Sequence, residues 1–169
     1  MYVIIKGKEN FLDNPHPPIR GSSPGERTGH IMVPMEGTVY VVDDDASVCN
    51  AVRRLLKSAQ YYVRTFASAE EFRQGDFKST PGCLLLDIRL PGISGFELQQ
   101  ELLASGIRMP VIFITGHDRA GMEEQAMKLG ATAYLRKPFD EETLLGAVRL
   151  AMKSLSNGKT TEKKSDPTG

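Results

Sequence analysis

Four apolar stretches of the sequence each end in a polar side chain that could take part in chemistry. The stretch VYVV is followed by Asp43 and Asp44, CLLL by Asp87, VIFI by Thr115, and AYLR by Lys137. If these stretches are strands of one parallel sheet, all five side chains lie at its carboxyl edge, where ligands bind in open α/β sheets. Carboxylates, a hydroxyl and an ammonium group at one edge can hold a divalent metal ion and a phosphoryl group together. The pattern therefore predicts phosphate chemistry on a carboxylate.

The three carboxylates suit a magnesium site beside a nucleophile. Mg²⁺ takes oxygen ligands and keeps several waters, so it needs only one or two protein carboxylates besides a phosphate oxygen. We expect Asp44 to bind the metal directly and Asp43 to bind it directly or through water. Asp87 and the backbone carbonyl of Arg89 would complete the protein ligands. An oxygen of Asp87 can also attack phosphorus in line, as in enzymes that form an aspartyl phosphate.

Lys137 and Thr115 suit the phosphoryl group itself. Charge that develops on phosphoryl oxygens needs a cation opposite the metal, which Lys137 can supply, and the Thr115 hydroxyl can donate a hydrogen bond. Gly116 would leave room for the group. Taken singly, each residue has a simpler explanation, since an Asp after a strand often caps a helix, the role expected for Asp45. The coincidence of four such strand endings at one edge favours a site.

Alternating strand and helix patterns predict how these residues are positioned. Short loops between alternating elements imply a parallel sheet covered on both faces. Right-handed crossovers then favour a doubly wound, flavodoxin-like α/β fold with strand order 2-1-3-4-5, which places Asp43 and Asp44 beside Asp87. The expected strands are Thr38–Val42, Tyr62–Phe66, Cys83–Leu86, Val111–Ile114 and Ala131–Leu135. The expected helices are Ala46–Gln60, a short helix with a capping box at Ser68 and Glu71, Ser94–Ser105, Arg119–Leu129, and a final helix that Asp140 caps and that runs to Leu155.

Helical spacing also predicts which side chains of the first helix face the core. Val48, Val52, Leu55 and Ala59 recur at intervals that place them on one face. Leu98 and Leu102 are expected to point inward in the same way.

The sequence divides into one folded domain and two polar ends. Residues 1–37 are rich in proline and glycine and predict a flexible N-terminal arm, whereas residues 156–169 are polar without periodicity and predict a disordered tail. Residues 38–155 form the expected domain.

Lys plus Arg and Asp plus Glu number 21 each, which gives no sign of a nucleic-acid partner. No apolar stretch is long enough to span a bilayer, Cys49 and Cys83 are expected to be reduced and buried, and a cytoplasmic location is expected.

The segment from Thr38 to Leu155 resembles the receiver domain of two-component response regulators. The resemblance lies in the acidic pair of VVDDD, in LLLDIRLPGISG around Asp87, in FITG around Thr115 and in LRKPF around Lys137. FITGH and KPF most resemble receivers of the nitrogen-fixation regulator type, which usually carry a helix-turn-helix that this sequence does not show. We therefore expect either a stand-alone receiver or a chain without its output domain.

The resemblance implies a phosphorylation-dependent switch. A sensor histidine kinase or small phosphodonor would phosphorylate Asp87 with Mg²⁺ bound, and Lys137 and Thr115 would stabilise the phosphoryl group. The face formed by the fourth helix, fifth strand and fifth helix would then change, with Tyr134 as its switch residue, to control a partner protein or homodimer formation. The resemblance also implies a cis Lys137–Pro138 peptide and a role for His117 in setting the lifetime of the acyl phosphate. It implies no enzyme activity on an outside substrate, no membrane association and no direct binding of nucleic acid.

Two alternatives remain open at this point. A phosphohydrolase of the haloacid-dehalogenase kind also forms an aspartyl phosphate, and Asp43 followed by Asp45 matches its signature, but it would leave Asp87 without a role. A receiver-shaped interaction module that works without phosphorylation is the other. A P-loop enzyme is excluded because no G-x-x-x-x-G-K-[ST] motif occurs.

Overall fold

The computed structural model describes residues 37–158, in which five strands and five helices alternate. The expected arm and tail therefore lie almost wholly outside the described residues. The strands are β1 (Thr38–Val42), β2 (Tyr62–Phe66), β3 (Gly82–Asp87), β4 (Val111–Thr115) and β5 (Ala133–Arg136). The helices are α1 (Ala46–Ser58), α2 (Ala69–Gln74), α3 (Gly95–Ala104), α4 (Met122–Lys128) and α5 (Glu141–Gly158).

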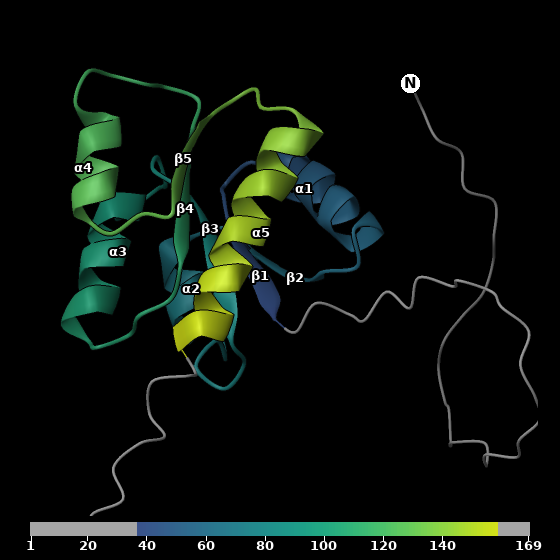
Figure 1. The fold of residues 1–169 in the computed structure, drawn as a ribbon. Coiled ribbons are helices and arrows are strands. Elements are labelled where there is room, and N and C mark those ends of the chain that lie inside the picture. Colours follow the sequence, from purple (N-terminus) through teal and green to yellow (C-terminus); the bar gives the residue numbers. More distant parts are fainter. Residues whose placement is uncertain (1–36, 159–169) are drawn as a thin grey trace, which may run out of the picture. The chain divides into compact units, whose positions relative to one another are not determined.

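The sheet is parallel throughout, with strand order β2-β1-β3-β4-β5, and this confirms the predicted topology (Figure 1). Strand β1 pairs with β3 so that Val42 lies opposite Leu86. The residues that follow this pair, Asp43 and Asp87, are therefore neighbours at the carboxyl edge. On the other side of β3, β4 pairs with β5 so that Thr115 lies opposite Arg136, which brings Lys137 to the same edge.

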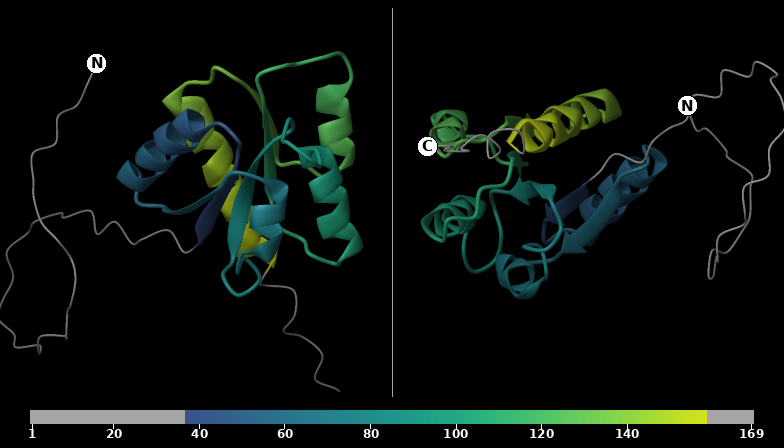
Figure 2. Two further views of the ribbon diagram at one scale, coloured as in Figure 1. Left: turned by 180° about the vertical axis from the view of Figure 1, so that it is seen from behind. Right: turned by 60° about the horizontal axis from the view of Figure 1, so that its bottom comes forward.

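Helices lie on both faces of the sheet (Figure 2), and each face carries its own hydrophobic core. Alternate residues of a strand point to opposite faces: Val39 and Val41 pack with α1 and α5, whereas Tyr40 and Val42 pack with α2, α3 and α4. All residues of β1, β3 and β4 are buried, and most residues of β2 are not, as expected for central strands and an edge strand. A central strand that is buried on both faces fixes its final carboxylate in place.

Helix α1 begins as predicted, but its most deeply buried side chains differ from those expected. The Asp45 side chain accepts hydrogen bonds from the backbone N–H groups of Ser47 and Val48, so Asp45 is the N-cap. The predicted face of Val48, Val52, Leu55 and Ala59 does pack against the core, but the most buried side chains are Cys49, Val52 and Leu56, so the centre of the buried face is rotated toward Cys49 and Leu56. The apolar stripe is wide enough that the expected residues still pack at its margin.

The capping box lies at a different helix from the one predicted. At α2, the Ser68 hydroxyl accepts from the Glu71 N–H, but the Glu71 carboxylate accepts from Ala67 instead of Ser68. The full reciprocal pair forms at α3, where the Ser94 hydroxyl accepts from the Glu97 N–H at 3.2 Å and the Glu97 carboxylate accepts from the Ser94 N–H at 2.7 Å. The expected inward positions of Leu98 and Leu102 on this helix are confirmed.

Several predicted boundaries move because of local backbone conformation. Gly121 has a φ of +86°, which a helix interior does not allow, so α4 begins at Met122 and not at Arg119. Gln60 has a φ of +66°, and α1 ends at Ser58. Helix α5 continues past the predicted Leu155 to Gly158, the last residue that the structure describes.

Within residues 37–158, no helix combines the length and the apolar composition needed to cross a lipid bilayer.

The N-cap of α5 gives a prediction about stability and pH. The Thr143 N–H donates to the Asp140 carboxylate at 2.7 Å, and this backbone hydrogen bond holds the pKa of Asp140 below its usual value. A carboxyl whose folded-state pKa is lowered stabilises the fold above its unfolded-state pKa, and this stabilisation is lost as the pH falls through the folded-state pKa. We expect Asp140→Ala to lower the melting temperature at neutral pH by roughly a few degrees, and the difference from wild type to shrink as the pH falls through the folded-state pKa of Asp140.

Asp140→Asn is the matched control, because its amide oxygen still accepts the capping hydrogen bond without titrating. A melting-temperature difference between Asp140→Ala and wild type that persists unchanged in acid would show that the carboxylate charge contributes nothing.

Candidate functional site

Three carboxylates gather where β1 and β3 end. Asp43, Asp44 and Asp87 each offer an oxygen, and these oxygens all lie within 4.8 Å of one another. Asp43 and Asp87 are buried and Asp44 is exposed, so solvent reaches the cluster on the side of Asp44. A set of hard oxygen donors of this kind fits Mg²⁺ better than a softer metal. The structure thus brings together the three carboxylates that the sequence predicted.

Lys137 joins two of these carboxylates. Its ammonium nitrogen lies 2.6 Å from Asp43 Oδ2 and 2.5 Å from Asp87 Oδ2. The lysine follows β5 directly, and its backbone N–H donates to the carbonyl of Thr115 at 2.7 Å, which continues the β4–β5 pairing. The Lys137–Pro138 peptide is cis, as expected. One cation therefore links the ends of three strands.

The charge states of this group follow from burial and pairing. Burial raises the pKa of Asp43 above its usual value, only partly offset by hydrogen bonds from Lys137 and the Asp45 N–H. Burial alone would lower the pKa of Lys137, but its bonds to Asp43 and Asp87 more than compensate and raise it. The lysine is consequently a fixed positive charge against the carboxylates.

Backbone contacts hold the first acidic residue in place. The Asp43 N–H donates to the Phe66 carbonyl at 3.1 Å, and Asp43 Oδ1 accepts from the Asp45 N–H at 2.9 Å. The thiol of Cys49 donates to the Asp43 carbonyl at 3.3 Å. Cys49 and Cys83 are both free and buried, as predicted, but the contact of Cys49 with the acidic loop was not predicted.

The end of β3 is held just as closely. Asp87 Oδ1 accepts from the Arg89 N–H at 2.8 Å, and the Gly95 N–H donates to the Ile88 carbonyl at 3.0 Å. A Cβ on Gly95 would lie 2.3 Å from the Asp87 carbonyl oxygen, so a side chain at this position cannot fit without moving the strand end. The importance of Gly95 was not predicted. The expected use of the Arg89 carbonyl as a metal ligand stays a prediction.

Thr115 is buried at the end of β4, where its hydroxyl oxygen accepts from the His117 N–H at 3.1 Å. The hydroxyl hydrogen remains able to donate. A Cβ added to Gly116 would lie 4.0 Å from the Lys137 side chain. The space between Thr115 and Lys137 is therefore open at Gly116, as expected. The His117 side chain is exposed, and its effect on acyl-phosphate lifetime stays a prediction.

Tyr134 lies on β5 at one side of this site. Its hydroxyl donates to the Asp118 carboxylate at 2.6 Å, and Arg136 pairs with the same carboxylate at 2.7 Å. Burial, followed by the bond to Asp118, raises the pKa of the tyrosine above its usual value, so the phenol stays neutral. These polar contacts were not predicted, since no sequence spacing relates Asp118 to Tyr134 and Arg136.

The family model of the response regulator receiver domain matches residues 39–149. Among curated proteins, the chain is 41% identical over 130 residues to the response regulator protein TmoT of Ectopseudomonas mendocina, with 77% of this chain and 59% of TmoT covered. It is 44% identical over 115 residues to the transcriptional regulatory protein TdiR of Thauera aromatica, with 68% of this chain and 51% of TdiR covered. The chain thus spans between about half and three fifths of the length of these relatives.

Solved structures of response regulators also match this chain. The response regulator StyR is matched with a TM-score of 0.71 and 41% identity, over 76% of this chain and 65% of StyR. The structure titled FixJ-N is matched with a TM-score of 0.64 and 34% identity, over 69% of this chain and 94% of that one. The resemblance stated from the sequence motifs is confirmed.

The close approach of Gly95 to Asp87 predicts that Gly95→Ala impairs the site. The new methyl group must displace the Asp87 carbonyl, so Asp87 and the acidic pair lose their relative positions, and we expect phosphorylation by a small phosphodonor to slow by about tenfold or more. Gly146→Ala is the control, because nothing lies within 4 Å of a Cβ added there in α5. Equal rates for the two variants, measured by intact mass against time, would contradict the positional argument.

We expect the Lys137 ammonium group and a divalent cation to compete for the carboxylates of Asp43 and Asp87. Lys137→Met removes the internal positive charge from Asp43 and Asp87, so we expect Mg²⁺ to bind about tenfold more tightly in calorimetric titration. The metal-free variant should unfold at a lower temperature, because Asp43 is then buried without the opposite charge of Lys137. Lys128→Met, which removes an exposed lysine paired only with Glu124, is the control. Unchanged or weaker Mg²⁺ binding in Lys137→Met would refute the competition.

Proposed function

This chain belongs to the response regulator receiver domain family, and on that premise we propose that it is switched by transfer of a phosphoryl group to Asp87. The observation that carries the proposal is the position of Lys137, which bridges Asp43 and Asp87 at 2.6 and 2.5 Å beside a cluster of three carboxylates. A fixed cation at a nucleophilic carboxylate is what a phosphoryl group with its own negative oxygens requires. We propose a sensor histidine kinase or a small phosphodonor as the source of that group.

Burial distinguishes the nucleophile from its neighbour. The Asp43 side chain is 0% exposed and is held through both oxygens, by the Asp45 N–H and by Lys137. Asp87 is 7% exposed in its side chain and lies at the end of the central strand. Asp87 is likewise held through both oxygens, by the Arg89 N–H and by Lys137, so the difference lies in exposure alone. Asp87 is the more accessible of the two to an incoming phosphorus, which supports Asp87 as the acceptor and argues against the haloacid-dehalogenase alternative.

The proposed reaction is an in-line displacement at phosphorus. An oxygen of Asp87 forms the new P–O bond while the bond from phosphorus to the donor's leaving group breaks, and the leaving group takes up a proton from solvent. Lys137 moves from the carboxylates to the phosphoryl oxygens, and the Thr115 hydroxyl donates to one of them. Later attack by water on phosphorus returns Asp87 and releases phosphate, so the chain acts on its own phosphoryl group and on no outside substrate.

We propose that Asp43, Asp44, Asp87 and the Arg89 carbonyl hold Mg²⁺ during this reaction. When bound, the ion supplies positive charge that neutralises phosphoryl oxygens and screens the carboxylates from one another. The donor set on which this rests is the cluster of three carboxylate oxygens within 4.8 Å.

The output is proposed to be a change in the face formed by α4, β5 and α5. Tyr134 lies on this face, and its strand leads directly into Lys137. A phosphoryl group that draws in Lys137 and Thr115 changes the ends of β5 and β4 and so reaches this face. We propose that the changed face binds a partner protein or a second copy of the chain.

The assignment of Asp87 predicts the result of a phosphorylation assay. Incubation of the full chain with a small phosphodonor and Mg²⁺ should add the mass of one phosphoryl group, and Asp87→Ala should add none. Asp76→Asn, which changes an exposed carboxylate in the loop between α2 and the start of β3, should behave as wild type. A mass gain that survives in Asp87→Ala, or many turnovers of a phosphomonoester that depend on Asp43, would overturn the proposal.

A further inference from the structure

Helix α4 is held to the domain by side chains from other elements more than by its own ends. It spans seven residues, and Ala126 is the one fully buried side chain among them. Its N-cap is Gly121, which has no side chain to accept a hydrogen bond from the first turn. Because a short helix without a cap has little stability of its own, outside contacts must fix its position.

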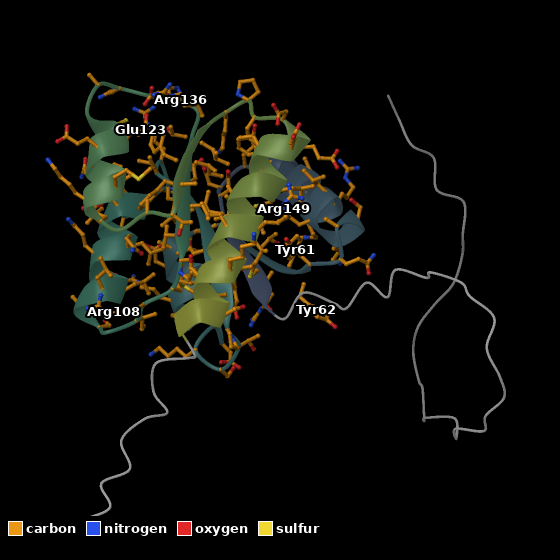
Figure 3. All side chains as sticks on the ribbon, viewed as in Figure 1. Tyr61, Tyr62, Arg108, Glu123, Arg136 and Arg149 are labelled. Carbon is orange, nitrogen blue, oxygen red and sulfur yellow. The ribbon has the colours of Figure 1, made fainter. Side chains whose placement is uncertain are left out.

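At the N-terminal end these contacts come from β5. Arg136 Nη2 lies 3.0 Å from Glu123 Oε2 in the first turn of α4, and Arg136 Nε lies 2.7 Å from Asp118 Oδ2 in the loop before it. Figure 3 shows Arg136 and Glu123 close together where β5 and α4 meet. The Tyr134 hydroxyl donates to the same Asp118 carboxylate, and the Arg136 guanidinium lies 5.9 Å from the Tyr134 ring centre. One arginine therefore connects the helix, the loop and the tyrosine.

At the C-terminal end the contact is of a different kind. Gln99 of α3 is 4% exposed, and its amide nitrogen donates to the Leu129 carbonyl at 3.2 Å, where α4 ends. The Ala131 N–H donates to the Ala126 carbonyl at 3.1 Å and closes the same turn. A buried hydrogen bond is costly to break, because water cannot replace it, whereas an exposed ion pair exchanges readily with solvent. The Arg136 side chain is 60% exposed.

We infer that Arg136 is an autoinhibitory latch that holds the N-terminal end of α4 and keeps Tyr134 bonded to Asp118, while the Gln99 contact is the hinge about which α4 turns when the latch opens. The inference rests on the proposed function, since phosphorylation of Asp87 provides the force that opens the latch.

Both halves of the latch are attached to residues of the site. Arg136 directly precedes Lys137, and Asp118 follows Thr115 by three residues. The Lys137 N–H is bonded to the Thr115 carbonyl at 2.7 Å, so the ends of β4 and β5 are joined, and a displacement of this joined end by a phosphoryl group carries Arg136 with it. Ion pairs at 2.7 and 3.0 Å depend on alignment and weaken with small displacements. Phosphorylation thus opens the contacts at the near end of α4 and leaves the far end attached.

The test compares latch variants of the full chain with a matched neighbour. Glu123→Gln and Asp118→Asn each remove one partner of Arg136, whereas Glu124→Gln changes the adjacent residue, which pairs with Lys128 within α4. Each protein is titrated with beryllofluoride, a phosphoryl stand-in, in the presence of Mg²⁺, and binding is followed by NMR. Because an open latch removes a cost from activation, we expect the apparent dissociation constant to fall by about two- to fivefold in Glu123→Gln and Asp118→Asn. Glu124→Gln should match wild type.

Hydrogen exchange tests the hinge in the same samples. On addition of beryllofluoride, the amides of Met122 and Gln125, which donate to the Arg119 and Gly121 carbonyls at 3.1 and 2.9 Å, should lose protection, while those from Ala126 to Leu129 keep it. Equal loss at both ends would refute the hinge, and a dissociation constant that is unchanged in the latch variants, or equally changed in Glu124→Gln, would refute the latch. Intact mass after treatment with a phosphodonor separates this from the proposed function: variants that phosphorylate normally but show no shift overturn the latch alone, and absence of phosphorylation in wild type overturns the proposed function.

Discussion

One ammonium group shared by two buried carboxylates connects the parts of this molecule that must act together. The Lys137 ammonium group contacts Asp43 and Asp87, and the Lys137 backbone N–H is bonded to the Thr115 carbonyl, so β1, β3, β4 and β5 all end at this one residue. Burial makes this arrangement costly to disturb, because removal of either the lysine or a carboxylate leaves the opposite charge buried without compensation. A phosphoryl oxygen that takes the place of a carboxylate as the partner of Lys137 therefore changes the charge interactions at several strand ends at once.

The fold makes that arrangement possible through strand order and close packing. With β1 next to β3, the residues after Val42 and Leu86 must be neighbours, and a glycine at position 95 lets α3 start directly against the Asp87 carbonyl. The same topology puts the first turn of α4 beside the end of β5, where Arg136 pairs with Glu123. The site and the surface proposed to report on it thus meet at adjacent residues, Lys137 and Arg136, at the end of β5.

The topology and the main site residues could be predicted from the sequence because apolar strands ending in Asp, Thr and Lys leave a regular local pattern. Asp43, Asp87 and Lys137 came from that pattern together with the strand order that it implied. The contacts of Cys49, Gly95 and Arg136 could not be predicted, because they depend on the distance between elements and not on spacing along the chain. Helix boundaries moved where Gln60 and Gly121 adopt a positive φ, which only the folded backbone reveals.

Reductive trapping after phosphorylation tests the central claim most directly. Borohydride reduces an acyl phosphate to an alcohol, so a phosphorylated aspartate is converted to homoserine at its own position in the chain. If Asp87 is the acceptor, peptide mapping after treatment with phosphodonor, Mg²⁺ and borohydride will find homoserine at position 87, and Asp43 and Asp44 unchanged. Homoserine at position 43 or 44, or the absence of homoserine from a chain whose intact mass has gained a phosphoryl group, would contradict the account.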